Sequence, residues 1–125
     1  MTDRRILVVE DDPDTLRRMV SLLETEGWRT TSAANSSEGF YAAVGHFPDL
    51  VVLDLELPGM DGCQVIGHLR EWYEGPIIAL SDRGEEENVI RALDQGADDY
   101  LQKPFSQGAP VPVFGGGPAG GLPGS

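Results

Sequence analysis

Three kinds of feature are scarce in this 125-residue chain: cysteine, lysine and long apolar runs. The single cysteine, Cys63, cannot form an internal disulfide, and no apolar run approaches the roughly 20 residues that cross a bilayer. The N-terminus has no basic start followed by an apolar run of signal-peptide length. We therefore expect a cytoplasmic protein with no membrane segment.

Positive charge is scarce as well. The chain has 21 acidic and 9 basic residues, a net charge of −12, so phosphate backbones should repel it. We therefore expect no direct binding of nucleic acid by this domain. Eight of the basic residues are arginine and Lys103 is the only lysine, which makes the position of Lys103 worth following.

What the chain does have is an alternation of two apolar patterns. Residues 6–9, 50–53 and 77–80 are short unbroken apolar runs, typical of parallel strands that are buried on both faces. Residues 29–33 fit an edge strand and 99–101 a short last strand. Helical patterns lie between them, so we predict an α/β fold: a doubly wound, flavodoxin-like parallel sheet of five strands in the order 2-1-3-4-5.

The helices between the strands are predicted from apolar residues at helical spacing. Asp12 before Pro13 is typical of a helix start, and Gly27 and Gly96 fall where helices end. The predicted apolar faces are Leu16, Met19, Val20 and Leu23; Phe40, Ala43, Val44 and Phe47; Val65, Ile66 and Leu69; and Val89, Ile90 and Leu93.

The composition changes after Ser106. Residues 108–125 contain seven glycines and four prolines and no charged residue, which is a poor helix composition. We predict one domain over residues 1–106 and an irregular Gly/Pro-rich tail over residues 107–125.

Polar residues follow four of the predicted strands. Glu10 and Asp11 follow the first strand, Asp54 the third, Ser81 the fourth and Lys103 the fifth. Parallel strands end at one edge of the sheet, so these side chains should share one pocket. Carboxylates this close repel one another and call for a cation, and a set of oxygen ligands without paired His or Cys favours Mg²⁺.

The same pocket suits phosphoryl chemistry. A hydroxyl and an ammonium group suit the oxygens of a phosphoryl group, whose transfer needs positioning and charge neutralisation. A carboxylate can itself be the nucleophile and form an aspartyl phosphate. Asp54, in the middle of the pocket, is the candidate, and the following Pro58-Gly59 turn leads to Asp61, the predicted cap of the next helix.

Over about residues 4–106 the sequence resembles the receiver domains of bacterial two-component response regulators. Its fourth and fifth strand regions look most like receivers of the winged-helix transcription-factor class, which includes potassium-uptake regulators. Each matching segment alone is weak evidence for the family, but the order and spacing of all the segments together are specific to it. The segments are 6–11, Asp54 with 58–62, Ser81, 96–100 and 103–105.

The resemblance implies a role for each matching position. Asp54 would accept a phosphoryl group from a sensor histidine kinase, Asp11 would bind Mg²⁺ directly, and Glu10 would act on the ion mainly through water. Ser81 would donate a hydrogen bond to a phosphoryl oxygen, and Lys103 would bridge the phosphate and the pocket carboxylates.

Tyr100 would be the switch aromatic, turning inward when Ser81 is drawn toward the phosphate. Glu56, two residues after Asp54, is placed in the metal set and is expected to tune hydrolysis of the phosphoryl group. Asp82 and Arg83 are expected to modulate the site, because the family ordinarily has a small residue in the place of Asp82.

The chain departs from the receiver pattern after Phe105. Receivers continue after the Lys-Pro-Phe segment with a fifth helix that contributes to a dimer face, whereas here the Gly/Pro-rich tail follows and no effector domain is seen. We expect the sheet face beside the first helix to need another cover, either the tail itself or a neighbouring molecule. We favour association and predict a homodimer.

Two other functions compete with a phosphorylation-dependent signalling receiver. One is a receiver-like interaction module that is no longer phosphorylated. The other is a small phosphohydrolase that would use Asp54 and Glu56, although that chemistry usually needs a longer chain. The leading hypothesis is a phosphoacceptor and not an enzyme, one that promotes only its own phosphotransfer and dephosphorylation.

Overall fold

The computed structural model describes residues 4–57, 61–81 and 86–102, and within these ranges nine elements alternate between strand and helix. The strands are β1 (Arg4–Val9), β2 (Trp28–Ala33), β3 (Leu50–Asp54), β4 (Ile77–Ser81) and β5 (Asp99–Gln102). The helices are α1 (Pro13–Thr25), α2 (Ser36–His46), α3 (Gly62–Arg70) and α4 (Glu86–Gln95). All five predicted strands are confirmed.

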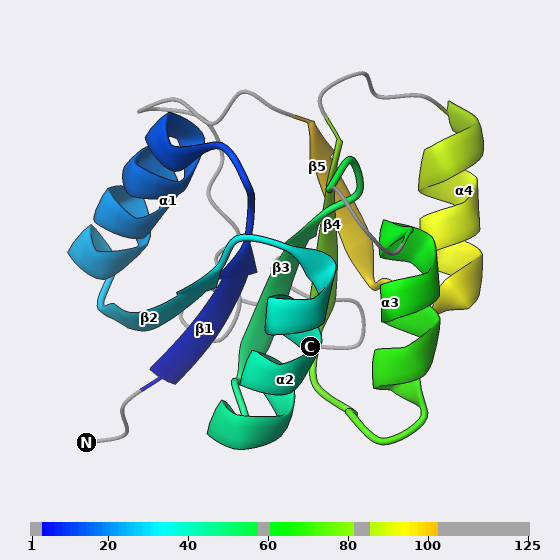
Figure 1. The fold of residues 1–125 in the computed structure, drawn as a ribbon, viewed down its shortest axis with the longest axis horizontal. Coiled ribbons are helices and arrows are strands. Elements are labelled where there is room, and N and C mark those ends of the chain that lie inside the picture. The colour runs from blue at the N-terminus through cyan, green and yellow to red at the C-terminus, as the bar shows by residue number, and fades with distance from the viewer. Residues whose placement is uncertain (1–3, 58–60, 82–85, 103–125) are drawn as a thin grey trace.

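The strands form one parallel sheet in the order β2-β1-β3-β4-β5 (Figure 1), which confirms the flavodoxin-like prediction. β3 is therefore the middle strand, and its five residues are all buried. The five residues of β4 are also all buried. Such strands can be apolar throughout because helices cover both faces of the sheet.

Two apolar layers result from the alternation of side chains along each strand. Leu7 and Val9 of β1 belong to a core cluster with residues of α2, α3 and α4. Ile6 and Val8 point the other way and belong to a second cluster with residues of α1. Figure 1 accordingly shows α1 well apart from the other three helices.

On the α1 side, Ile78 and Leu80 of β4 are fully buried, so they offer no exposed apolar patch in the monomer. The predicted tail, and the place of the fifth helix, lie outside the described residues. None of the helices in the described ranges is long and apolar enough to span a bilayer.

The predicted helix limits are confirmed where capping residues set them. Asp12 is the N-cap of α1 and accepts a hydrogen bond from the Thr15 amide at 2.9 Å, with Pro13 as the first helical residue. Gly27 and Gly96 follow α1 and α4 with φ of 98° and 127°. A Cβ on Gly96 would also come within 2.4 Å of Arg70 Cγ, so only glycine fits there.

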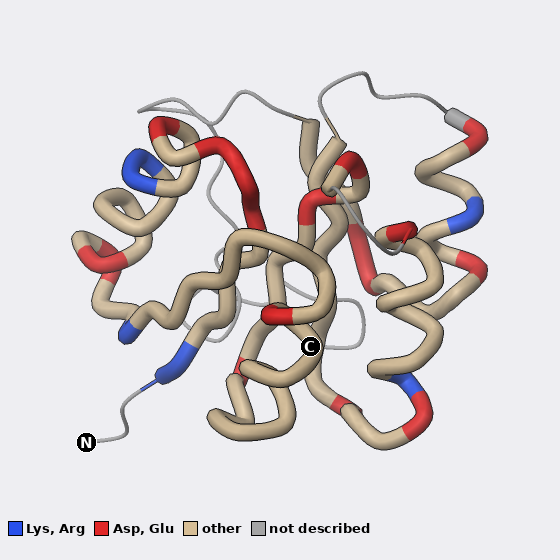
Figure 2. Tube along the Cα trace, in the orientation of Figure 1, with Lys and Arg blue, Asp and Glu red and all other residues tan. Residues whose placement is uncertain are grey.

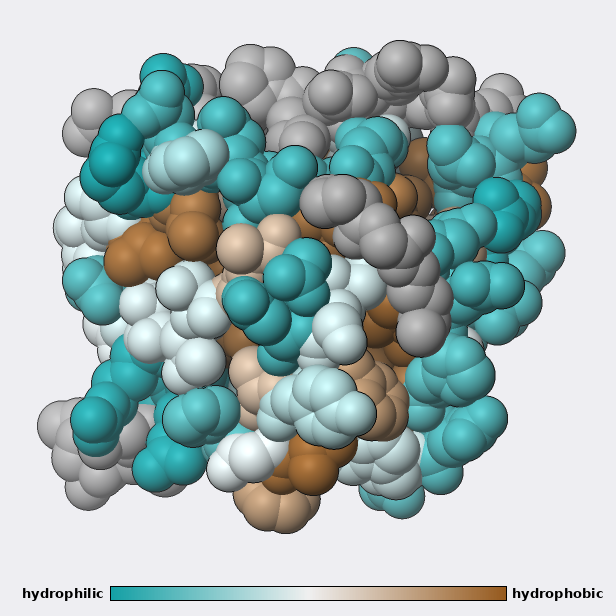
Figure 3. Space-filling view, viewed as in Figure 1, coloured by the Kyte–Doolittle hydropathy of each residue, from teal (hydrophilic) through white to brown (hydrophobic). Residues whose placement is uncertain are grey.

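Two of the predicted apolar faces are wrong in part. In α2, Val44 is 44% and Phe47 73% exposed. The helix ends at His46, and Phe47 takes the left-handed conformation (φ 47°), which turns it away from the face that buries Ala43. Figure 3 shows apolar atoms at the surface over the C-terminal part of α2.

In α4, Ile90 is 50% and Leu93 40% exposed, although both were predicted to face the core. Val89 is buried, as predicted, and Ala92 is buried in place of the other two. Val89 and Ala92 are three residues apart, so they lie on one side of the helix. The small Ala92 side chain allows a close approach to the core, and the helix is rotated accordingly.

Candidate functional site

Three of the predicted site residues, Glu10, Asp54 and Ser81, lie where β1, β3 and β4 end. Glu10 directly follows β1, while Asp54 and Ser81 are the last residues of β3 and β4. β3 lies between the other two strands, and the register places Leu53 beside Val9 and Asp54 beside Leu80. The carboxyl edge of the sheet therefore brings together residues that are far apart in the sequence, as predicted.

Three carboxylates meet at this edge. Glu10, Asp11 and Asp54 each offer an oxygen atom, and these atoms all lie within 4.8 Å of one another. Glu10 and Asp54 are each only 1% exposed, whereas Asp11 is exposed. Figure 2 shows the acidic segments that follow β1 and β3 at the same end of the sheet.

Backbone hydrogen bonds hold the two buried carboxylates in place. The Asp12 amide donates to Glu10 Oε2 at 3.0 Å, and the Glu10 amide donates to the carbonyl of Ala33 at 2.9 Å. The Glu56 amide donates to Asp54 Oδ1 at 2.8 Å. The acidic groups therefore have fixed positions before any ligand arrives.

The carboxylate cluster fits a hard divalent cation. Negative groups at this separation repel one another, and burial of two of them strengthens the repulsion. The donors are all carboxylate oxygens, and one of the three is open to solvent. Mg²⁺ prefers oxygen donors, uses few protein carboxylates and retains several water molecules, so the arrangement suits it.

Ser81 lies next to this cluster but contacts Glu56. The serine is fully buried, and its Oγ donates a hydrogen bond to Glu56 Oε2 at 3.0 Å. Glu56 itself is exposed, and its carboxylate is not among the three that meet within 4.8 Å in the described part of the chain. The sequence offered no signal for this pair, because the direction of a glutamate side chain depends on its rotamer.

The remaining predicted residues are only partly described. Tyr100 lies in β5 beside Ala79 of β4 and is 40% exposed, so its ring is at the surface in this state. Its switch role stays a prediction. Lys103, Asp82 and Arg83 lie outside the described residues, and their roles also stay predictions.

A helix cap fixes the far end of the segment that follows Asp54. Asp61 is the N-cap of α3, as predicted, and accepts a hydrogen bond from the Cys63 amide at 2.8 Å. Arg91 of α4 donates to the other oxygen of Asp61 at 2.9 Å. This hydrogen bond from the guanidinium is the main reason why the pKa of Asp61 is lowered.

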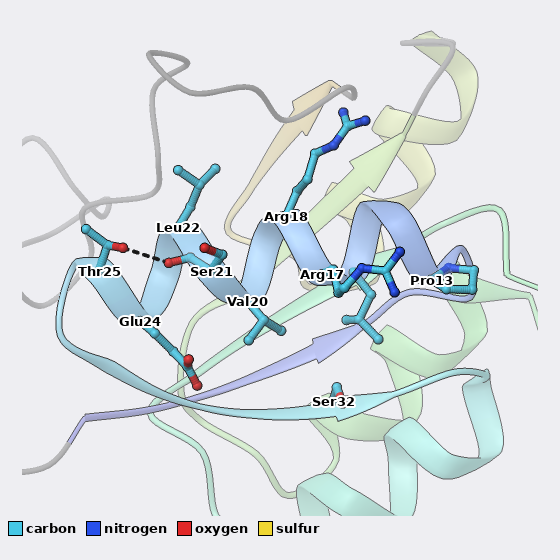
Figure 4. A pocket seen from close by; sticks show the side chains of 10 residues that line it. Pro13, Arg17, Arg18, Val20, Ser21, Leu22, Glu24, Thr25 and Ser32 are labelled. Atoms are coloured by element: carbon cyan, nitrogen blue, oxygen red, sulfur yellow. Dashed lines mark hydrogen bonds between the residues drawn. The ribbon is translucent and has the colours of Figure 1, made fainter.

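A separate hollow lies along α1. The described residues that line it come from α1 and from Ser32 of β2, and Figure 4 shows Arg17, Arg18 and Glu24 among them. Glu10, Asp11 and Asp54 do not line it. The hollow is therefore separate from the acidic cluster at the carboxyl edge of the sheet.

Comparison with protein families gives a match to the response regulator receiver domain over residues 6–110. Among curated proteins, the KDP operon transcriptional regulatory protein KdpE of Escherichia coli is 46% identical over 103 residues, covering 82% of this chain and 46% of the relative. KdpE of Mycobacterium tuberculosis is 43% identical over 100 residues, covering 80% of this chain and 44% of the relative. The chain thus spans less than half the length of these relatives.

Solved structures show the same likeness. A CheY-like receiver domain protein from Methanospirillum hungatei has a TM-score of 0.79 and 30% identity, covering 84% of this chain and 85% of that one. The BeF3-activated receiver domain of RstA from Klebsiella pneumoniae also has a TM-score of 0.79 and 30% identity, with coverage of 84% and 90%.

Proposed function

The chain belongs to the response regulator receiver domain family, and we propose that it is a phosphorylation-dependent signalling domain that accepts a phosphoryl group on Asp54. The observation that carries the proposal is the position of Asp54. It ends the middle strand of the sheet, is buried, and shares the acidic cluster with Glu10 and Asp11. The family is one of signalling domains and not of conventional enzymes.

In the proposed reaction Asp54 is the nucleophile. One of its carboxylate oxygens forms a bond to phosphorus while the bond from phosphorus to the donor atom breaks, and the bonding electrons leave with the donor. The Glu56 amide, which donates to Asp54 Oδ1 at 2.8 Å, orients the carboxylate for this attack. Burial of Asp54 limits competing access of water.

The acidic cluster would hold Mg²⁺ through Asp11 and Asp54, with Glu10 acting on the ion mainly through water. The family normally binds Mg²⁺, and the ion supplies the positive charge that offsets the carboxylates and the incoming phosphoryl oxygens. Glu56 completes the predicted metal set. In the structure its amide donates a hydrogen bond to Asp54, and its carboxylate accepts one from Ser81.

The other predicted residues would act on the phosphorylated form. Ser81 would donate to a phosphoryl oxygen, and Lys103 would bridge the phosphate and the carboxylates. Tyr100 would turn inward as Ser81 moves. Asp82 and Arg83 would change the charge around the phosphoryl group. The domain would thereby promote its own phosphotransfer and dephosphorylation.

The proposed partner is a sensor histidine kinase, because receiver domains of this family interact with such kinases. A cytoplasmic location follows from the proposal, since phosphodonors made from ATP are found there. The net charge of −12 argues that this domain does not itself bind nucleic acid.

We also propose a homodimer. Ile90 and Leu93 are exposed apolar residues three positions apart on α4, and α4 contacts β5, where Tyr100 is exposed as well. Exposed apolar residues that gather in one place mark interaction surfaces more often than scattered ones.

Phosphoryl uptake tests the proposed function. The protein is incubated with acetyl phosphate, with and without Mg²⁺, and its intact mass is measured. The proposal predicts a gain of one phosphoryl group that needs Mg²⁺. No gain would favour an interaction module that is not phosphorylated, and turnover of an added phosphomonoester would favour a phosphohydrolase.

A further inference from the structure

The inference concerns the Glu56–Ser81 pair and rests on the function proposed above. Ser81 Oγ lies 3.0 Å from Glu56 Oε2, and Ser81 is fully buried. The pair spans the ends of two adjacent strands, because Glu56 comes two residues after the end of β3 and Ser81 ends β4. The contact therefore links the segment that carries Asp54 to the strand beside it.

Glu56 contacts both Asp54, the proposed phosphoacceptor, and Ser81. Its amide donates to Asp54 Oδ1 at 2.8 Å, while its carboxylate accepts from Ser81. The Leu55 amide between them donates to the carbonyl of Leu80 at 2.8 Å, which fixes the backbone of the segment relative to β4. The Glu56 side chain is thus held within reach of the serine.

A serine hydroxyl has one proton to donate. In the structure it goes to a carboxylate oxygen, an acceptor that makes a stronger hydrogen bond than a neutral group does. A phosphoryl group on Asp54 would bring new anionic oxygens to the same end of the sheet. Ser81 cannot donate to both, and a glutamate beside a phosphoryl dianion is repelled.

We propose that Glu56 is a positioning residue that holds the Ser81 hydroxyl in the unphosphorylated state and competes for it with the phosphoryl group on Asp54. Phosphorylation exchanges one anionic acceptor for another. Glu56 then sets the fraction of phosphorylated molecules in which the Ser81 hydroxyl donates to the phosphoryl group. Its carboxylate accepts the hydrogen bond of Ser81, and we propose that its effect passes through that residue.

A double-mutant cycle tests the proposal with beryllofluoride as the phosphoryl mimic. Its affinity is measured in the presence of Mg²⁺ by fluorine NMR for the wild type, Glu56→Ala, Ser81→Ala and the double variant. Glu74→Ala is the matched control, because it removes one exposed glutamate in the turn before β4, at the other end of the sheet.

We expect Glu56→Ala to tighten binding by roughly tenfold, the size of one charge-assisted hydrogen bond that no longer competes. In the Ser81→Ala background the same change should have an effect at least about threefold smaller. Glu56→Gln, which keeps an oxygen acceptor without the charge, should lie between the wild type and Glu56→Ala. Glu74→Ala should bind as the wild type does.

The outcomes separate this inference from the proposed function. Equal effects of Glu56→Ala in both backgrounds would show that Glu56 acts by charge repulsion alone and would overturn the inference only. Failure of the wild type to bind beryllofluoride would overturn both. As an independent readout, the Ser81 amide resonance of the unliganded Glu56→Ala variant should move toward its beryllofluoride-bound position, and an unmoved resonance would contradict the inference.

Discussion

At the scale of single residues, two buried carboxylates stand out among the described residues. Glu10 and Asp54 are each 1% exposed, and their oxygens lie within 4.8 Å of each other and of Asp11. Burying an ion costs several kcal/mol even after the protein relaxes. Backbone amides that donate to both carboxylates offset part of that cost, and a bound cation would offset more.

This cost leads to a prediction about Asp11. Replacing Asp11 by Ala removes the one carboxylate of the cluster that faces solvent, so Mg²⁺ affinity should fall by roughly tenfold or more. Calorimetric titration with Mg²⁺ measures the change. Asp14→Ala, which removes an exposed acid in the first turn of α1, is the control and should leave the affinity unchanged. An unchanged affinity in Asp11→Ala would refute the metal assignment.

Much of the site could be predicted because it follows from the strands. Glu10, Asp11, Asp54 and Ser81 come directly at strand ends, so the parallel sheet brings their backbones together whatever the side chains do. The Ser81–Glu56 hydrogen bond could not be predicted in this way. It depends on the side-chain torsions of a residue beyond the strand, and the sequence pattern does not determine them.

At the scale of elements, an ion pair ties the start of α3 to α4. Asp61 caps α3 and pairs with Arg91, at 2.9 Å. The Arg91 guanidinium lowers the pKa of Asp61 in the folded protein. A carboxyl whose pKa is lower in the folded state adds stability above its unfolded pKa, and this stability is lost as the pH falls through the folded pKa.

Asp61→Asn should therefore lower the free energy of unfolding at pH 7 but have less effect in acid. Asparagine keeps the capping oxygen, so the change isolates the charge. Both partners are more than a third exposed, and we expect a loss of only about 0.5 kcal/mol at pH 7 that shrinks below about pH 4. Urea unfolding at the two pH values measures it, and an equal loss at both would contradict the assignment.

Helix limits were predicted better than helix faces. Asp12, Pro13 and the two glycines after α1 and α4 set local backbone geometry, which acts without the rest of the fold. The direction in which a helix turns its apolar residues depends on its packing partners. Phe47 and Ile90 both fit an apolar pattern, yet one sits on a left-handed cap and the other on the outer side of α4.

At the scale of the whole molecule, the exposed apolar residues indicate how the chain would associate. Ile78 and Leu80 on the α1 side of β4 are fully buried, so these two side chains give no reason for association. Ile90 and Leu93 on α4 are 50% and 40% exposed. We propose α4 as the interface of the homodimer, and Val44 and Phe47 at the end of α2, which are 44% and 73% exposed, are the alternative.

The dimer prediction has a matched pair of variants. The wild type should sediment as a dimer at high micromolar concentration, and Ile90→Glu should shift it toward the monomer by adding a charge to an apolar interface. Val44→Glu places the same charge at a residue of α2 that is 44% exposed and should leave the dimer intact. A wild type that sediments as a monomer would refute the homodimer, and equal effects of the two variants would refute α4 as the interface.

The account as a whole rests on Asp54 as the phosphoacceptor, and intact-mass measurement of site variants tests this most directly. After incubation with acetyl phosphate and Mg²⁺, the wild type and Asp94→Asn, which changes an exposed acid on α4, should each gain one phosphoryl group. Asp54→Asn should gain none, because an amide cannot act as the carboxylate nucleophile. A phosphoryl gain by Asp54→Asn equal to that of the wild type would contradict the central claim.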